Sequence, residues 1–272
     1  MIDEIISSGK FFLISGPCVI EEEYIMFTAA EKLKNISQKL DIPVIYKSSF
    51  MKDNRSSVEF FQGPGIDEGL KLLEKIKKQF YLPVLSDIHY PDQVKPAAQV
   101  LDVLQIPAYL CMQTTLVVEA ARTGKTINIK HGQFIAPGNM IHPIKKIEST
   151  GNKKIIVTER GYTFGYNDLV VDPRSFFELS RFGYPVVFDI THSVRKYGIP
   201  SADPAGGMRQ YLPTLGRSGV AAGVDGIFIE VHPDPATAMC DAASQLKLSD
   251  LEEFLKPLIE IHHLEKRYRK QK

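Results

Sequence analysis

The sequence contains no tryptophan, and its three cysteines are an odd number without a closely spaced CxxC pair. This cysteine content excludes a scaffold built on disulfides and fits a reducing compartment. No apolar run reaches the 18 residues of a membrane span, and the acidic start MIDEIISSGK lacks the regions of a signal peptide. We therefore expect a cytoplasmic protein with no membrane partner.

Neither sign of charge is in excess, because 33 basic and 32 acidic residues give a formal net charge of +1. Binding to nucleic acid by counterion release requires a far more basic surface, so we expect no nucleic-acid partner. Hydrophobic residues make up 44% of the 272 positions and charged residues 24%. Such a chain can build a large core without cross-links.

Eight short apolar runs alternate with longer amphipathic segments along the whole chain, with no linker between them. The runs are 11–15, 44–48, 84–88, 103–107, 126–130, 155–159, 186–191 and 226–230. Strands that are apolar on both faces and separated by crossover helices form parallel sheets. Eight such units predict one (β/α)8 TIM barrel domain over 1–272, with a short N-terminal extension. A doubly wound open sheet is the rival fold, but GPC after the first strand lacks the GxGxxG spacing.

Polar or reactive residues lie at or just after the end of every predicted strand. In a barrel, the carboxyl ends of the strands meet at one face, where catalytic residues gather. In chain order the residues are Cys18, Lys47 with Ser49, Asp87, Gln105, Lys130, Arg160, His192 and Glu230. They recur about every 30 residues, the length of a βαβ repeat. We therefore expect one crowded polar opening.

Five cations would share this opening, namely Lys47, Lys52, Arg55, Lys130 and Arg160. Gathering like charges costs free energy unless an anion neutralises them. Phosphates and carboxylates suit guanidinium and ammonium groups best. Solvated loop cations are the alternative, but loop cations have no reason to follow strand ends. The pattern predicts a polyanionic ligand.

A second group, Cys18, His192, Glu230 and Asp241, comes from the first, seventh and eighth strand regions, which are neighbours in a closed barrel. One thiol, one imidazole and two carboxylates suit a divalent ion such as Zn²⁺, Fe²⁺, Mn²⁺ or Co²⁺. The alternative is a buried thiol, a core histidine and carboxylates paired with nearby cations. Residues 194–209, rich in glycine and proline, follow the seventh strand, where a substrate lid or a mobile surface loop would lie.

Together these motifs resemble the 3-deoxy-D-manno-octulosonate 8-phosphate synthase (2-dehydro-3-deoxyphosphooctonate aldolase) family along nearly the whole chain. The matching segments are SGPCVIE, YKSSF followed by KDNRSS, GPGIDEG, SDIH, VLQIPA, INIKHGQF, TERGYTFGYNDLVVD, FDITHS and GIFIEVHPDPATAMCDAAS. The resemblance implies a homotetrameric TIM barrel that condenses phosphoenolpyruvate with arabinose 5-phosphate and releases inorganic phosphate, in lipopolysaccharide precursor synthesis.

The resemblance also implies a role for each site residue. Matches to the phosphoenolpyruvate site are Lys47, Ser49, Gln105, Lys130 and Arg160, with Asp87 beside them, and matches to the aldose phosphate site are Lys52, Asn54, Arg55 and Ser56. Matches to the metal ligands of the metal-dependent branch are Cys18, His192, Glu230 and Asp241. A divalent metal cofactor is thereby implied, with Lys130, Arg160, His192 and Asp241 as catalytic residues.

Two departures bear on the sugar. CMQTTL stands where the family usually has a CRQTDL-like run, so Met112 replaces an arginine that reaches the aldose phosphate from a neighbouring subunit, and Thr115 replaces an aspartate. His131 stands where a lysine is customary. Alternatives are therefore another aldose phosphate, erythrose 4-phosphate as in the sister 3-deoxy-D-arabino-heptulosonate 7-phosphate synthases, or a non-catalytic phosphometabolite-binding barrel. Of these, the sister synthases favour KPRTS where this chain has KDNRSS.

Overall fold

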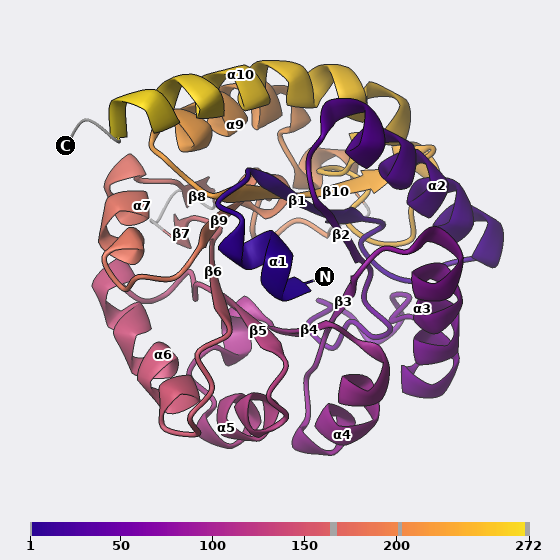
Figure 1. Cartoon of the computed structure of the whole chain (residues 1–272). Coiled ribbons are helices and arrows are strands. Elements are labelled where there is room, and N and C mark those ends of the chain that lie inside the picture. The colour runs from indigo at the N-terminus through magenta and orange to yellow at the C-terminus, as the bar shows by residue number, and fades with distance from the viewer. Residues whose placement is uncertain (1, 164–167, 201–202, 270–272) are drawn as a thin grey trace.

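Eight parallel strands close into a barrel in this computed structural model, which describes residues 2–163, 168–200 and 203–269. The strands pair in the order β1-β2-β3-β4-β5-β6-β9-β10, and β10 pairs back with β1 (Figure 1). Their bounds are β1 Phe12–Gly16, β2 Val44–Lys47, β3 Val84–Asp87, β4 Val103–Ile106, β5 Thr126–Lys130, β6 Ile155–Glu159, β9 Val186–Asp189 and β10 Gly226–His232. The predicted (β/α)8 fold is confirmed.

Each predicted run overlaps one barrel strand, and the seventh run extends furthest beyond the end of its strand. It was expected over 186–191, but β9 ends at Asp189 and the short helix α8, Ile190–Ser193, begins at once. The Asp189 carboxylate accepts a hydrogen bond from the backbone N–H of His192, which is a helix N-cap. This cap turns His192 from the strand direction toward the open face of the barrel.

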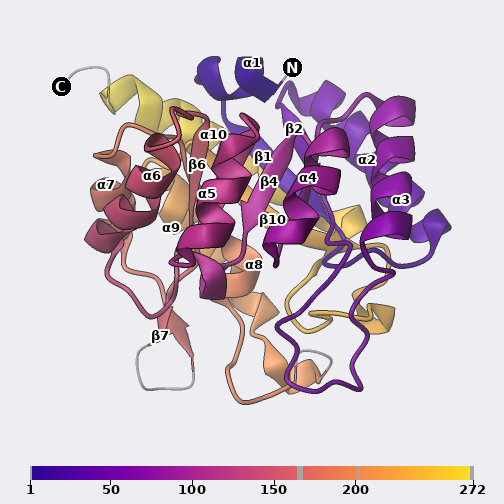
Figure 2. The same cartoon turned by 90° about the horizontal axis from the view of Figure 1, so that it is seen from below.

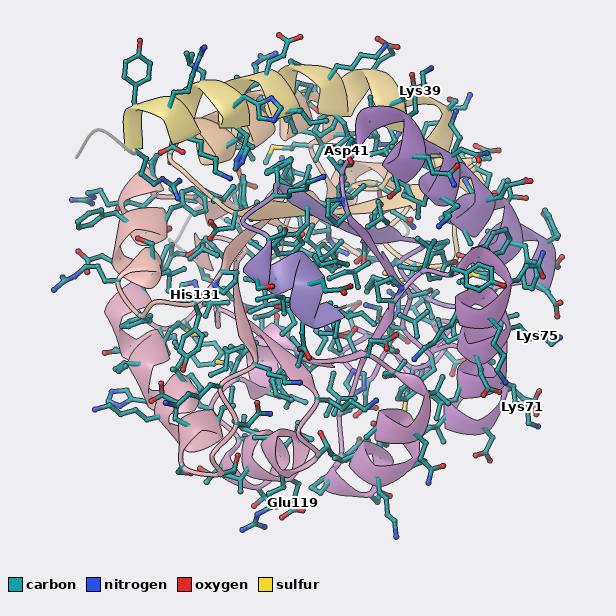
Figure 3. All side chains as sticks on the ribbon, viewed as in Figure 1. Lys39, Asp41, Lys71, Lys75, Glu119 and His131 are labelled. Atoms are coloured by element: carbon teal, nitrogen blue, oxygen red, sulfur yellow. The ribbon has the colours of Figure 1, made fainter. Side chains whose placement is uncertain are left out.

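Helices surround the barrel as an outer ring (Figure 1). They are α2 Glu23–Leu40, α3 Ile66–Phe80, α4 Pro91–Val100, α5 Thr114–Arg122, α6 Ile141–Glu148, α7 Pro173–Ser180, α9 Leu212–Ala221 and α10 Leu251–Arg269. Each buries an apolar stripe, and their charged faces point outward, as Lys71 and Lys75 of α3 do in Figure 3. None of the described helices is long and apolar enough to span a bilayer.

Shorter elements decorate the connections. Strands β7 Tyr162–Thr163 and β8 Leu169–Val170 form an antiparallel pair, and β11 Leu246–Lys247 extends the sheet beside the end of β10. The 3-10 turns are η1 Ala108–Leu110, η2 Pro137–Met140, η3 Pro204–Gly206, η4 Arg209–Tyr211, η5 Pro235–Thr237 and η6 Leu248–Asp250.

Alternate residues of each strand divide between two cores, because successive side chains of a strand point to opposite faces. In β1, Phe12 and Ile14 fill the barrel interior, while Leu13 packs with the helices outside. The helix α1, Ile2–Ser7, inserts Ile5 into the interior core and covers the amino-terminal opening. The long loops that follow the strands all extend from the opposite face (Figure 2). Access to the barrel therefore lies at the carboxyl ends of the strands.

Candidate active site and metal centre

Asp87, at the end of β3, links three of the predicted substrate-binding residues. Its Oδ2 accepts a hydrogen bond from Ser49 Oγ at 2.6 Å and lies 3.1 Å from Lys52 Nζ, and its Oδ1 accepts from Gln105 Nε2 at 2.5 Å. Burial alone would raise the pKa of Asp87, but the ammonium groups of Lys52 and Lys47 hold it well below the usual value. Asp87 is therefore a carboxylate that fixes its neighbours.

The hydrogen bonds continue across the barrel floor to two residues that the sequence analysis did not select. Asn128 donates through Nδ2 to Gln105 Oε1 at 2.8 Å, and Thr158 donates through Oγ1 to Asn128 Oδ1 at 2.6 Å. The amide of Gln105 is thereby held in one orientation, donating to Asp87 and accepting from Asn128. The available signal was a polar residue inside an otherwise apolar strand, as in TINIK and IIVTE.

Asp189 joins the predicted catalytic residues Lys130 and His192, and it was also missed. Its Oδ2 lies 2.5 Å from Lys130 Nζ and 2.8 Å from His192 Nδ1. The Lys130 ammonium also lies 3.8 Å from the centroid of the Phe228 ring, within cation–π range. Burial lowers the pKa of Lys130, and Asp189 offsets this only in part. Asp189 thus sustains the charge on Lys130 and orients the His192 ring.

The four predicted metal ligands lie together. Asp241 Oδ2 is 3.5 Å from Cys18 Sγ and 3.4 Å from His192 Nε2, which is 3.8 Å from Glu230 Oε1. Donors that sit roughly 2.0–2.3 Å from a tetrahedral ion are themselves about 3.3–3.8 Å apart. Glu230 Oε2 is buried and has no hydrogen-bond partner among the described residues. The donor set, its spacing and this unsatisfied oxygen fit a divalent ion.

The charges around these donors keep both carboxylates ionised. Lys47 Nζ lies 2.6 Å from Glu230 Oε1 and donates to the Cys18 carbonyl at 2.9 Å, and Arg195 pairs with Asp241 Oδ1. Burial alone would raise the pKa of both acids, but Lys47 and Arg195 lower the pKa of Glu230 and Asp241 respectively. Burial raises the pKa of the Cys18 thiol, so an ion must displace its proton to bind.

A cavity of about 160 Å³ opens onto this cluster. Its walls include the predicted residues Lys52, Asn54, Arg55, Ser56, Arg160, His192 and Asp241. Lys47, Ser49, Asp87, Gln105 and Lys130 are buried in the contacts described above and do not line it. The predicted aldose phosphate residues therefore form the walls, and most of the predicted phosphoenolpyruvate residues lie deeper.

The loop after α8 forms another wall of the cavity. Tyr197 Oη accepts hydrogen bonds from Arg160 Nη2 at 3.1 Å and Gln133 Nε2 at 2.9 Å, and Lys196 lines the cavity beside it. Two residues of the predicted lid segment 194–209, Ser201 and Ala202, lie outside the described residues. Residues 195–199 of the segment line the cavity.

Cations outnumber carboxylates in these contacts and in the cavity wall. The seven cations are Lys47, Lys52, Arg55, Lys130, Arg160, Arg195 and Lys196, against four carboxylates, Asp87, Asp189, Glu230 and Asp241. Seven minus four leaves three positive charges before any metal is added. Such an excess in a buried site favours polyanionic ligands.

The residues at which the sequence departs from the synthase pattern lie outside the cavity wall. Met112 packs against the core, and its carbonyl accepts from Lys146 Nζ at 2.8 Å, while Thr115 is exposed on α5. His131 is enclosed, with Nδ1 at 3.1 Å from Glu159 Oε2 and Nε2 at 2.8 Å from the Ile135 carbonyl (Figure 3). His131 therefore ties the loop after β5 to the end of β6.

Comparisons with known proteins show the family of this chain. Residues 3–267 match the profile of the DAHP synthetase I family. The chain is similar to proteins named 2-dehydro-3-deoxyphosphooctonate aldolase from Trichlorobacter lovleyi, 54% identical, and Geotalea uraniireducens, 55% identical, each over 90% of both chains. It is 50% identical to the protein of the same name from Fusobacterium nucleatum, over 97% of this chain and 96% of that one. With this extent of matching sequence and a closed barrel carrying these residues at its carboxyl end, the chain belongs to the DAHP synthetase I family.

Proposed function

We propose that this protein condenses phosphoenolpyruvate with arabinose 5-phosphate to give 3-deoxy-D-manno-octulosonate 8-phosphate and inorganic phosphate, as a step of lipopolysaccharide precursor synthesis. The observation that carries the proposal is the convergence of a Cys, His, Glu and Asp donor set with an excess of three positive charges at one cavity. The names of relatives at 50–55% identity support the same reaction.

Phosphoenolpyruvate would lie at the inner end of the cavity. Arg160 suits its phosphate, because among the described residues its guanidinium donates to two neutral oxygens, the His192 carbonyl and Tyr197 Oη, and pairs directly with no carboxylate. Lys130, below it, would share the phosphate and stabilise its departure. Lys47 and Ser49 would orient the carboxylate; Asp87 fixes the position of Ser49, and Glu230 with the Cys18 carbonyl fixes that of Lys47.

The aldose phosphate would occupy the outer part, where Lys52, Asn54, Arg55 and Ser56 form the wall. In the reaction, C3 of phosphoenolpyruvate attacks the aldehyde carbon and water adds at C2. The resulting hemiketal phosphate then loses inorganic phosphate by C–O cleavage. Positive charge develops at C2 and negative charge on the aldehyde oxygen. The cations would neutralise the phosphate and the carboxylate attached to C2, and the donor set would place the charge of a bound ion beside the aldehyde oxygen.

Cys18, His192, Glu230 and Asp241 would hold a divalent ion, Zn²⁺, Fe²⁺, Mn²⁺ or Co²⁺. When bound, such an ion supplies Lewis acidity that either polarises the aldehyde or activates water. Asp189 holds the Nδ1 side of the His192 ring, which leaves Nε2 directed at Asp241 and Glu230. Arg195 holds the other oxygen of Asp241, which leaves Oδ2 for the ion.

The proposal extends to a homotetramer in the cytoplasm. Its support is the resemblance of the motifs to the synthase family, together with the absence of a membrane-spanning helix from the described residues. Size-exclusion chromatography with light scattering tests the tetramer, and a mass corresponding to one or two chains would remove it.

A panel of aldose phosphates tests the reaction itself. The purified protein, loaded with metal, is mixed with phosphoenolpyruvate and arabinose 5-phosphate, erythrose 4-phosphate or ribose 5-phosphate, and released phosphate is measured. We expect the highest kcat/KM with arabinose 5-phosphate. No phosphate release with any sugar would favour a binding protein, and a preference for another sugar would reassign the substrate, an outcome that Met112 makes worth testing.

A further inference from the structure

Cys240 lies against the proposed metal ligands and has no part in the set described so far. Its Sγ is 3.0 Å from Cys18 Sγ, and both side chains are fully buried. Cys18 precedes Cys240 by 222 positions, so the contact is made by the fold and not by local sequence. The third cysteine, Cys111, is buried elsewhere, packed near Gly132.

The donor atoms form two overlapping groups. Cys18, Cys240 and Asp241 make one group and His192, Glu230 and Asp241 the other, and within each group the donor atoms lie within 4.8 Å of one another. Asp241 belongs to both, since its Oδ2 faces Cys18 and His192. An ion bound by this oxygen would therefore have both thiols within reach.

The backbone conformation at Asp241 and two neighbouring side chains position the Cys240 thiol beside the proposed metal ligands. Asp241 has φ of 50°, the left-handed conformation that few residues other than glycine adopt. This conformation brings the side chains of Cys240 and Asp241 toward the same cluster of donors. In an extended chain, consecutive side chains would point to opposite sides. Arg55 Nη1 lies 2.8 Å from Cys240 Sγ and Gln245 Nε2 donates to the Cys240 carbonyl at 2.8 Å, so both the sulfur and its backbone are held.

We propose that Cys240 is a further ligand of the metal ion, so that the centre carries two thiolates and selects a thiophilic ion. The inference rests on the metal centre of the proposed function. Each thiol releases its proton to solvent when the ion binds, and the guanidinium of Arg55 stabilises the second sulfur anion. Two soft ligands favour Zn²⁺ or Co²⁺ over Mn²⁺, which prefers oxygen donors.

The test compares Cys240→Ser with Cys111→Ser, a matched control that removes a buried thiol away from the donors. Each full-length protein is stripped and reloaded with Co²⁺, and the near-ultraviolet thiolate-to-cobalt charge-transfer band is recorded. We expect Cys240→Ser to lose about half of the band, and its Zn²⁺ affinity in competition with a chelator to fall by about 10- to 100-fold. Its Mn²⁺ affinity should change by less than about threefold, since Mn²⁺ gains little from a thiolate. Cys111→Ser should match the unsubstituted protein in all three.

A second measurement needs no variant. X-ray absorption at the zinc edge of the unsubstituted protein should give two sulfur scatterers at about 2.3 Å. One sulfur scatterer, or a full cobalt band with an unchanged Zn²⁺ to Mn²⁺ preference in Cys240→Ser, overturns the role of Cys240 and leaves the proposed metal centre standing. Failure of the unsubstituted protein to bind either ion would instead remove the metal centre itself.

Discussion

Replacing Asp189 with asparagine removes a negative charge that two site residues share. The carboxylate lies 2.5 Å from Lys130 Nζ and 2.8 Å from His192 Nδ1, and it is completely buried. Removing one partner of a buried ion pair leaves the other charge uncompensated, at a cost of about 3–5 kcal/mol. Lys130 can avoid much of that cost by losing its proton, because its pKa is already lowered by burial.

The sign of the pH effect follows from these contacts. Asp189 raises the pKa of Lys130 against the lowering caused by burial, so its loss lets the pKa fall further. The charged ammonium then exists only at lower pH, and the basic limb of the pH profile of kcat/KM for phosphoenolpyruvate should move toward acid. Near neutral pH we expect kcat/KM to fall by about 100-fold, which corresponds to about 2.7 kcal/mol of lost transition-state stabilisation.

Phosphate release measured from pH 5 to 10 at saturating Zn²⁺ checks this prediction, because saturating metal separates the effect on Lys130 from weaker metal binding by His192. Asp102→Asn is the matched control. Asp102 also pairs with a lysine, Lys77 at 2.8 Å, and accepts from a backbone N–H, that of Val84, but at the amino-terminal end of β4. A profile of Asp189→Asn that coincides with the control, with kcat/KM within about threefold, would refute the role given to Asp189.

Three further predictions concern the cavity, the metal and the barrel interior. Lys196 lines the cavity and pairs with no carboxylate of the described residues, so Lys196→Ala should raise KM for the aldose phosphate about 10- to 100-fold and leave that for phosphoenolpyruvate unchanged. Steady-state kinetics check this against Lys71→Ala on the outer face of α3, and equal shifts for both substrates would contradict it. Removing metal with a chelator should abolish phosphate release, and added Zn²⁺ should restore it; full activity in excess chelator would exclude the metal from the reaction. Ile5→Ala at the closed end should lower the free energy of unfolding by about 2 kcal/mol in urea titration without changing kcat, and a loss of kcat would show that α1 acts on the site.

The sequence predicts this barrel well because two patterns, that of buried strands and that of amphipathic helices, alternate along the whole chain. Each strand is a short apolar run bounded by turn residues, and the crossover segments show helical spacing, so all eight strands could be found. The error at 186–191 has a local cause. Thr191 follows the apolar run VVFDI without a break, and the strand ends where the His192 N–H, Thr191 Oγ1 and Ser193 Oγ donate hydrogen bonds to Asp189.

The sequence predicts which residues lie at the carboxyl ends of the strands, but not which of these side chains contact one another. Residues at the strand ends had to share one face, which brought Cys18 on one side and His192 with Glu230 on the other within reach of Asp241. The partners of these residues depend on side-chain reach across the barrel, which spacing along one chain does not encode. Asp189 and Cys240 were missed for this reason. The role of Asp189 follows from its contact with Lys130, and that of Cys240 from its contact with Cys18, and both partners are far away in the sequence.

Phe228 lies in the interior core of the barrel, close to two lysines of the candidate site. Its ring lies on the barrel floor, with Lys130 Nζ 3.8 Å and Lys47 Nζ 5.4 Å from its centroid. On one side, strands β9, β10 and β1 carry the metal donors, and on the other, β3 and β4 carry Asp87 and Gln105. Lys130 is also paired with Asp189 and Lys47 with Glu230, so the ring and these two carboxylates together hold both ammonium groups in the interior of the barrel. The proposed substrates would therefore meet in the cavity beside these pairs, where Arg160 and His192 line the wall and the carboxylate partners keep Lys47 and Lys130 in place.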